Sequence, residues 1–239
     1  MNADNISVIV FAPSAAKDRR AAWNHCRRFW MDCKYQRIWC RADEADYWKA
    51  AVAHAGAEKA TGDILIFADA DCLVDRRALV ECIEAVTSGA ADMASPKTVT
   101  QRLTEEETKM VRRGGIPGKA LEIQAYKAQD CGGVFIVSRE FWQRSGGMDL
   151  RFRGWGGEDG AYGAVCRSIG RVYRSDSVMY HLYHEPQPTK ADNVYSTKAE
   201  NNALHIQYLD AERAGTMAEL LAERPEIQID YEVQCDSYQ

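Results

Sequence analysis

The chain has 239 residues, of which 27% are charged and 46% are hydrophobic, and its formal net charge is -5. This length allows one large α/β domain, or a domain with an extension, and leaves ample chain for a buried core. Residues 190–239 hold four Lys/Arg and ten Asp/Glu, so this segment carries -6 and the rest of the chain about +1. The lack of a large basic region weakens a nucleic-acid-binding interpretation.

The cysteine spacing and the lengths of the apolar segments indicate in which cellular compartment the protein is expected. None of the eight cysteines forms a C-x-x-C pair, and no zinc-ligand spacing occurs. Cys26 and Cys33 lie seven residues apart, on one face of a helix, and are expected to be buried thiols. There is no charged-then-apolar leader and no apolar run near 18 residues. We therefore expect a soluble, cytoplasmic protein with reduced thiols and no integral membrane segment.

The first elements predict a ligand-binding sheet edge. The apolar, β-branched run at residues 6–11 is typical of a buried parallel strand, and the turn beginning Ala12-Pro13 follows it. The spacing of apolar residues predicts a helix over 17–31. Open α/β sheets bind ligands at the carboxyl ends of their strands, so Ala12 and Pro13 are candidate nucleotide contacts. Arg19 and Arg20 open the helix at the same end, where one of them, with Arg20 as the candidate, either faces the nucleotide or is an ordinary surface arginine.

Strands and helices then alternate along the chain. A weaker strand is predicted over 35–40, and an acidic turn with Asp43 follows. Asp43 either accepts a hydrogen bond from a nucleobase N–H or caps the next helix. That helix is predicted over the Ala-rich segment 47–60, a third strand over 64–68, and a third helix over 75–86. This alternation is typical of a parallel, doubly wound sheet.

Two carboxylates directly follow the third predicted strand, in Asp69-Ala70-Asp71. Side chains separated by one residue point to the same side of an extended chain. Such a pair of hard oxygen ligands can hold a divalent cation and leave positions open for phosphate oxygens. Taken alone, the same three residues also fit a solvated acidic turn.

The second half of the chain is less regular. Residues 93–99 fit a further strand, and the acidic run 105–107 indicates the start of a helix. In the following loop, Arg112 or Arg113 either meets a diphosphate or lies in a solvated basic turn. Further strands are predicted over 131–137, 171–173 and 178–180, and further helices over 139–144, 161–169 with an acidic first turn at 158–159, 199–210 and 217–222.

Three separated elements favour one joint chemistry: Asp69 with Asp71, the segment 155–159, and His181 or His184. A cation held by Asp71 and a histidine would neutralise charge that builds up on a leaving diphosphate. A carboxylate of the segment 155–159 would take the proton from an acceptor hydroxyl. The glycines of that segment would let a substrate approach the backbone, and its tryptophan would offer a flat apolar face to a sugar ring.

The order of motifs is distinctive. In chain order the motifs are Asp69-Ala70-Asp71, Gly132-Gly133, Gly146-Gly147-Met148-Asp149, Gly154-Trp155-Gly156-Gly157-Glu158-Asp159, and a histidine after a late strand. This order resembles that of the GT-A glycosyltransferases, over roughly residues 5–186. It is most similar to the family-two enzymes and to the C-terminal motif of the β-1,4-galactosyltransferases. The resemblance implies a single Rossmann-like α/β domain with a mostly parallel central sheet flanked by helices, plus a C-terminal extension.

The resemblance also implies roles on the donor side. Asp71 would be a metal ligand, and Asp69 would contact the ribose or the metal shell, with Ala70 between them at the nucleotide sugar. His181 is the first choice for the histidine ligand of the metal, and His184 is the alternative. The implied cofactor is Mn²⁺ or Mg²⁺, and the implied co-substrate is a nucleotide sugar, with a UDP-sugar as donor.

On the acceptor side, the resemblance assigns the general base to Asp159 and implies inversion at the anomeric carbon. Glu158 would bind the acceptor or brace the base. Trp155, Gly156 and Gly157 would contact the nucleotide sugar. The acceptor itself stays open between a glycan, a small molecule, a protein and a hydroxylated nucleic-acid base.

The expected organisation is a glycosyltransferase domain over 1–189, with a nucleotide-sugar half at about 1–99 and an acceptor half at about 100–189. Residues 190–239 form an acidic, partly helical extension. Two other functions compete: a nucleotidyltransferase, which needs a Gly-rich basic loop that residues 12–16 do not provide, and a non-catalytic nucleotide-sugar or carbohydrate-binding module. Retention of both Asp71 and Asp159 argues against the module, because a binder needs no base.

Overall fold

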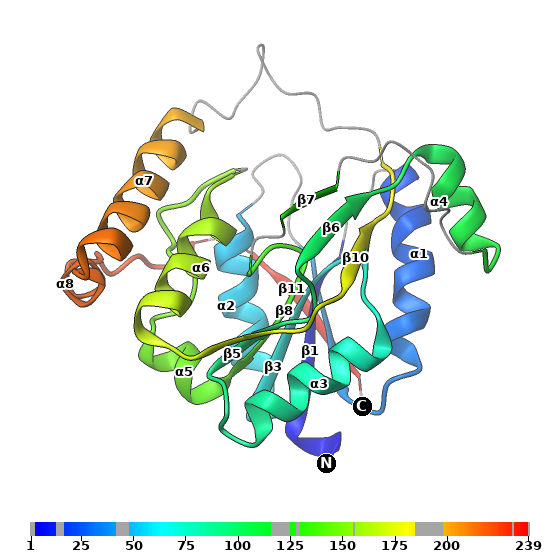
Figure 1. Ribbon diagram of the computed structural model, residues 1–239, viewed down its shortest axis with the longest axis horizontal. Coiled ribbons are helices and arrows are strands. Elements are labelled where there is room, and N and C mark those ends of the chain that lie inside the picture. Colours follow the sequence, from blue (N-terminus) through cyan, green and yellow to red (C-terminus); the bar gives the residue numbers. More distant parts are fainter. Residues whose placement is uncertain are drawn as a thin grey trace.

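Two β-sheets and the helices around them make up the computed structural model in Figure 1. It describes residues 3–12, 17–41, 48–115, 125–127, 130–154, 156–184, 198–230 and 232–238. The strands are β1 (Ile6–Phe11), β2 (Gln36–Arg41), β3 (Ile64–Asp69), β4 (Cys72–Leu73), β5 (Met93–Ser95), β6 (Val99–Arg102), β7 (Ala125–Lys127), β8 (Val134–Ser138), β9 (Val172–Arg174), β10 (Val178–His181) and β11 (Gln234–Tyr238). The helices are the short 3₁₀ helix η1 (Ala3–Asn5), α1 (Lys17–Met31), α2 (Lys49–Lys59), α3 (Arg76–Thr87), α4 (Glu105–Arg112), α5 (Arg139–Arg144), α6 (Glu158–Ile169), α7 (Lys198–Ala214) and α8 (Met217–Ala222).

The main sheet has seven strands in the order β11-β2-β1-β3-β8-β5-β9. The first three strands in the sequence pair in parallel, with β1 in the middle, and β9 pairs in parallel with β5. The strands β8 and β11 run antiparallel to their neighbours. The expectation of a mostly parallel α/β sheet flanked by helices is therefore confirmed.

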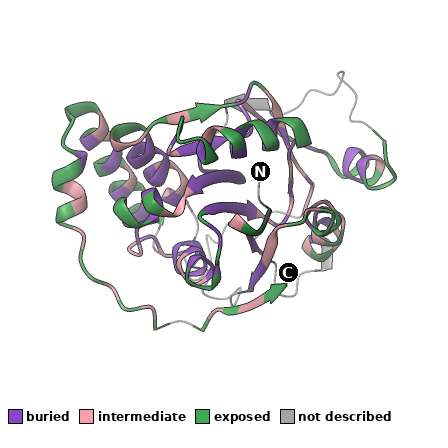
Figure 2. Cartoon of the chain, turned by 90° about the horizontal axis from the view of Figure 1, so that it is seen from below, coloured by how far each residue is buried: buried purple, intermediate pink, exposed green. Residues whose placement is uncertain are grey.

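Helices cover both faces of this sheet, and alternate residues of each strand enter different cores. On β1, Ile9 and Phe11 join the core that holds α2, α5 and α6, while Val8 and Val10 join the core that holds α1 and α3. Residues 6–11 are all buried, as an apolar strand between two helical layers requires. Figure 2 shows the buried central strands inside the more exposed helices.

The second sheet, of order β4-β10-β6-β7, lies beyond the carboxyl end of β3. Its presence makes the prediction of one strand over 93–99 wrong, since β5 belongs to the main sheet and β6 to the small one. Pro96 lies between the two strands and cannot donate a ladder hydrogen bond. The side chain of Lys97 turns inward there and donates to the carbonyl oxygens of Asp130 and Val134 at 3.1 and 2.6 Å.

The C-terminal segment packs against the rest of the domain. The helix α7 lies along α6, and β11 pairs antiparallel with β2 at the edge of the main sheet. A disulfide joins Cys40 of β2 to Cys235 of β11. The expectation of reduced thiols is wrong for this pair, because the pairing of β11 with β2 places the two residues directly opposite each other. The other six cysteines are free.

No helix in the described part of the chain combines the length and the apolar character needed to cross a membrane.

Candidate active site

The acidic motif Asp69-Ala70-Asp71 lies at the carboxyl end of β3, in the centre of the main sheet. The backbone N–H of Asp69 donates to the carbonyl oxygen of Gly133 at 2.7 Å, and the carbonyl oxygen of Asp71 accepts from Leu182 at 2.8 Å. Ala70 is buried between the two acids. The motif is therefore fixed through its backbone on both sides, which leaves the carboxylates for other partners.

Two histidines converge on Asp71. The Nε2 atom of His184 lies 3.3 Å from one carboxylate oxygen of Asp71, and that of His181 lies 3.8 Å from the other. Their ring centroids are 5.2 Å apart. Burial opposes ionisation of Asp71, but the charges of His181 and His184 outweigh it and lower the pKa of the carboxyl below its ordinary value.

The pairing of β4 with β10 explains this convergence. His181 is directly opposite Cys72, the residue that follows Asp71, and the chain beyond β10 then brings His184 back to the same carboxylate. The sequence predicts His181 as the ligand with His184 as the alternative, whereas the structure places both beside Asp71. A strand of two residues such as β4 is too short to be predicted from periodicity.

Asp71 and the two histidines form a suitable donor set for a divalent transition-metal cation. Carboxylate oxygens suit Mn²⁺, and imidazole nitrogens suit first-row divalent transition metals. The Cys72 thiol also lies in this group, with its sulfur within 4.8 Å of ligand atoms of Asp71 and His181. Burial, followed by the charge of Asp71, raises the pKa of the Cys72 thiol well above its ordinary value, so the thiol stays protonated. Sulfur is also a softer ligand than the carboxylate oxygen that Mn²⁺ prefers, so Cys72 is a weaker candidate than Asp71.

A lysine that sequence analysis did not single out joins the two predicted halves of the site. The Nζ atom of Lys49 lies 3.0 Å from Asp69 Oδ1 and 2.9 Å from Asp159 Oδ1. Its side chain is only 6% exposed, and its Nζ atom lies 5.2 Å from the centre of the Phe11 ring. Asp69 and Asp159, 90 residues apart in the chain, thus share one buried cation.

Lys49 takes this position because of the start of α2. The preceding residue, Trp48, forms an isolated parallel bridge with Gly154, and the Arg153 guanidinium stacks over the Trp48 ring at 3.2 Å. These contacts bring the first turn of α2 against the segment that leads to Asp159. The sequence contains one indication that Lys49 has a carboxylate partner. A cation in the first turn of a helix interacts unfavourably with the helix dipole, so a nearby negative charge is expected.

Glu158 and Asp159 open α6, as predicted. Glu158 accepts a hydrogen bond from the Gly156 N–H at 3.0 Å. The residue before the helix, Gly157, has φ of 94°, and a Cβ there would come within 2.9 Å of the Phe152 ring. Only glycine fits both conditions, so the turn that presents the two acids depends on it.

The two acids of α6 differ in their surroundings. Burial, and then the neighbouring Asp159 charge, raise the pKa of Glu158 to about 7. Burial and the charge of Asp69 also raise the pKa of Asp159, but Lys49 opposes this shift. The cation therefore favours the ionised form at Asp159 more directly than at Glu158.

Of the other residues predicted to contact the nucleotide sugar, some line a cavity and others lie outside the described residues. Ala12 and Arg20 line a cavity of about 330 Å³ between α1 and the β2–β11 edge, together with Trp23, Trp39 and Tyr238. Pro13, Asp43 and Trp155 lie outside the described residues.

The fold is that of the GT-A glycosyltransferases. The chain belongs to glycosyl transferase family 2, whose profile matches residues 21–146. A second profile, described as N-terminal domain of galactosyltransferase, matches residues 118–185 and thus includes the acids of α6 and both histidines.

Solved structures share the fold at low sequence identity. A mutant of Drosophila beta-1,4-galactosyltransferase 7 in complex with manganese, UDP-Gal and xylobiose has a TM-score of 0.52 and 14% identity, covering 83% of this chain and 79% of that one. GalNAc-T7 with UDP, GalNAc and Mn²⁺ has a TM-score of 0.51 and 16% identity, covering 93% and 46%. S. aureus TarS 1-349 with UDP-GlcNAc has a TM-score of 0.52 and 12% identity, covering 91% and 71%.

A curated relative matches a shorter stretch. N-acetylgalactosaminyltransferase 6 of Drosophila melanogaster is 34% identical over a match of 76 residues, and the match covers 27% of this chain. The matched stretch is 11% of that relative's length.

Proposed function

We propose that the chain is a metal-dependent, inverting glycosyltransferase that moves a sugar from a UDP-sugar to an acceptor hydroxyl group of a carbohydrate. The observation that carries this proposal is the single buried cation of Lys49 between Asp69 and Asp159. It holds the acid of the donor motif and the predicted base in one site. The presence of UDP or UDP-sugars in three solved structures of the same fold supports the choice of donor, and manganese in two of them supports the choice of metal.

Asp71, His181 and His184 are the residues that would hold the metal. When bound, a divalent cation supplies positive charge that stabilises the leaving diphosphate. Asp71 is well suited because its pKa is lowered, so it offers a carboxylate across the range of neutral pH. Two neighbouring imidazoles can complete the set without adding negative charge, which leaves the site attractive to the anionic donor.

Asp159 takes the proton of the acceptor hydroxyl in this proposal. The acceptor oxygen forms a bond to the anomeric carbon while the bond from that carbon to the diphosphate oxygen breaks, and the diphosphate leaves with the electron pair. One displacement from the opposite face inverts the anomeric configuration. Lys49 acts as a positioning residue, because it holds the Asp159 carboxylate in place and favours its ionised form without touching the reacting atoms.

Glu158 has a different part. With a pKa raised to about 7, it is partly protonated near neutral pH and can then donate a hydrogen bond as well as accept one. Its bond from the Gly156 N–H fixes its orientation beside Asp159. We assign to it the binding of an acceptor hydroxyl or the bracing of the base.

A donor screen tests the proposed function. Purified protein is incubated with UDP-, GDP- and TDP-sugars, with manganese or with EDTA, and the released nucleoside diphosphate is measured. We expect turnover of a UDP-sugar that EDTA suppresses and manganese restores, and an inverted anomeric configuration in the product by NMR. Turnover that is insensitive to EDTA would rule out the metal, and a retained configuration would rule out the single displacement.

Replacing Lys49 with methionine is expected to lower kcat/KM by about 10- to 100-fold, because the Asp159 carboxylate loses its counter-charge in a buried site. The pKa of Asp159 would rise further, so the acidic limb of the pH profile of kcat/KM should move to higher pH. Lys59→Met, at the exposed last residue of the same helix, is the matched control. A loss of activity with an unshifted pH profile would reduce Lys49 to a structural role.

A further inference from the structure

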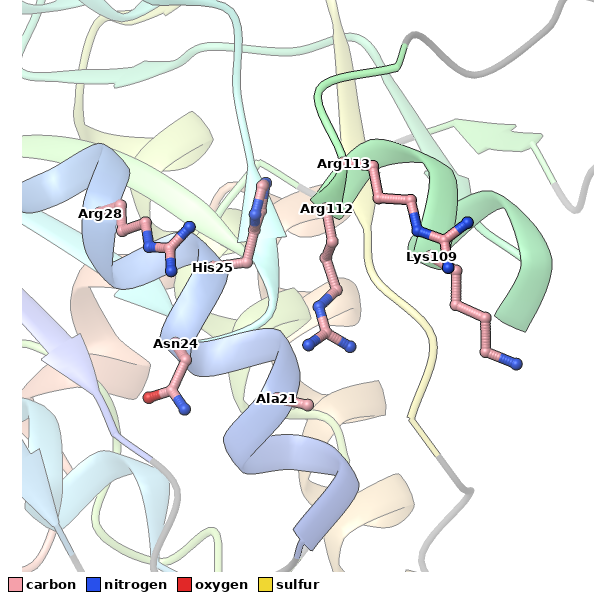
Figure 3. A pocket seen from close by; sticks show the side chains of 7 residues that line it. All are labelled: Ala21, Asn24, His25, Arg28, Lys109, Arg112 and Arg113. Atoms are coloured by element: carbon pink, nitrogen blue, oxygen red, sulfur yellow. The ribbon is translucent and has the colours of Figure 1, made fainter.

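A second polar pocket, of about 300 Å³, lies between α1 and the end of α4. Ala21, Asn24, His25 and Arg28 of α1 line one side, and Lys109, Arg112 and Arg113 line the other. Figure 3 shows Arg112 extending from α4 toward α1, with His25 rising from α1 beside it. None of the residues that line this pocket is acidic.

The pocket concentrates positive charge. Arg28, Arg112 and Arg113 are all exposed, and none of them forms an ion pair with another residue of the described ranges. Lys109 does have a partner, Glu105, one helical turn earlier, at 2.6 Å. Burial, and then the charges of Arg28 and Arg112, lower the pKa of His25, which shows that both guanidiniums act on the same point.

The helices that carry the arginines are held in place by the packing beneath them. Ala22 and Cys26 of α1 form a small apolar core with Leu103, Val111 and Leu182. The first turn of α4 is fixed by a capping box, in which Thr104 and Glu107 each accept from the other's backbone N–H. In addition, the Thr108 hydroxyl accepts from the Tyr183 N–H at 2.8 Å. The like charges are therefore brought together by rigid elements rather than by long surface loops.

This pocket is separate from the site of Asp71. Ala21, His25 and Arg28 recur at helical spacing and share one face of α1, whereas Ala22 and Cys26 lie on the next face. The face of α1 that carries Cys26 is the one near the active site, because burial and then the charge of Asp71 raise the pKa of the Cys26 thiol. None of the residues that line the pocket is one of the acids, histidines or the lysine of the active site.

We propose that the α1–α4 pocket is a binding site for a tetrahedral dianion, either free phosphate or a phosphate ester. Guanidinium groups present planar forks of N–H donors that match phosphate oxygens and keep their charge at any physiological pH. The positive charge of three guanidinium groups and one lysine is more than one carboxylate can neutralise. A phosphate group offers more oxygen atoms than a carboxylate and about twice its negative charge. The open, exposed lining admits a group that is attached to a larger molecule.

The test uses His25 as a local reporter. The chain has five histidines, so their ring resonances can be assigned by single substitutions and followed by NMR. The protein is titrated with inorganic phosphate, with glucose 6-phosphate, and with acetate at the same ionic strength. We expect a saturable shift of the His25 resonance with a phosphate ligand and none with acetate. A shift with both phosphate ligands shows that the site accepts a phosphate ester, whereas a shift with inorganic phosphate alone limits the site to the free anion.

Substitutions decide whether the arginines are responsible. In the double variant Arg28→Ala/Arg112→Ala, the phosphate affinity measured at His25 should fall by about tenfold or more, as the loss of charged hydrogen bonds implies. Arg77→Ala, at an exposed arginine of α3 that forms no ion pair with the described residues, should leave the affinity unchanged. The absence of a saturable shift, or an affinity equal in the double variant and the wild type, would overturn the proposal. Both arginines are exposed, so thermal unfolding should confirm that the double variant is folded.

Discussion

Asp159→Asn is expected to lower kcat by about 10²- to 10⁴-fold, which is the usual contribution of a general base. An amide cannot take the proton of the acceptor hydroxyl, but it has nearly the same shape as the carboxylate. Binding of the UDP-sugar should therefore persist, and tight binding of donor with loss of transfer is the expected pattern. Donor affinity is measured by calorimetry and transfer by product formation.

The control for this variant is Asp63→Asn, which makes the same change at an exposed residue just before β3, at the end of the strand opposite to the site. It should keep full activity. If Asp159→Asn instead transferred sugar at the wild-type rate, the base would have to be another group, and Glu158 would be the next residue to test.

Asp71→Ala should remove both metal binding and turnover. The substitution takes away the carboxylate to which His181 and His184 both point, at 3.8 and 3.3 Å. Because a metal supplies several kcal/mol of charge stabilisation, we expect kcat/KM to fall by about 10³-fold or more. Electron paramagnetic resonance of added Mn²⁺ measures the loss of binding directly, independently of turnover.

Cys72→Ala is the matched control, because Cys72 is the buried neighbour of Asp71 and lies within the same cluster. It should keep its affinity for Mn²⁺, since this ion prefers carboxylate oxygen to the softer sulfur of a thiol. Single substitutions of His181 and His184 by alanine then divide the remaining affinity between the two rings. Unchanged Mn²⁺ binding in Asp71→Ala would remove the proposed metal site altogether.

Much of the fold follows from apolar runs in the sequence. Residues 6–11 and 64–68 are almost wholly buried, and burial on both faces is what makes a parallel strand readable as a continuous apolar segment. Shorter or more polar strands carry no such signal. The strand β4 has two residues, and β11 is the half-exposed sequence Gln-Cys-Asp-Ser-Tyr, so neither could be predicted from periodicity.

The candidate site likewise contains residues that the sequence indicates and one that it does not. Asp69, Asp71, Glu158 and Asp159 could be proposed from the sequence because each belongs to a motif in which neighbouring residues constrain the chemistry. Lys49 belongs to no motif, and its role depends on a contact between Trp48 and Gly154 that joins segments about 100 residues apart. Such a contact is a property of the tertiary structure. The only local indication of it in the sequence is a lysine at the start of a helix, where a positive charge is unfavourable.

The pairing of β11 with β2 has a consequence for the behaviour of the whole molecule. Without β11, the N–H and C=O groups along the outer side of β2 would form an open edge, which is a template for pairing with a strand of another copy. The last strand occupies this template from within the same chain, and the Cys40–Cys235 bond fastens it there. The edge of the sheet is therefore β11 itself, a strand of five mostly polar residues that carries a charge at Asp236. A short, charged edge strand is a poorer template for edge-to-edge aggregation than the more apolar β2 would be, an effect unrelated to sugar transfer.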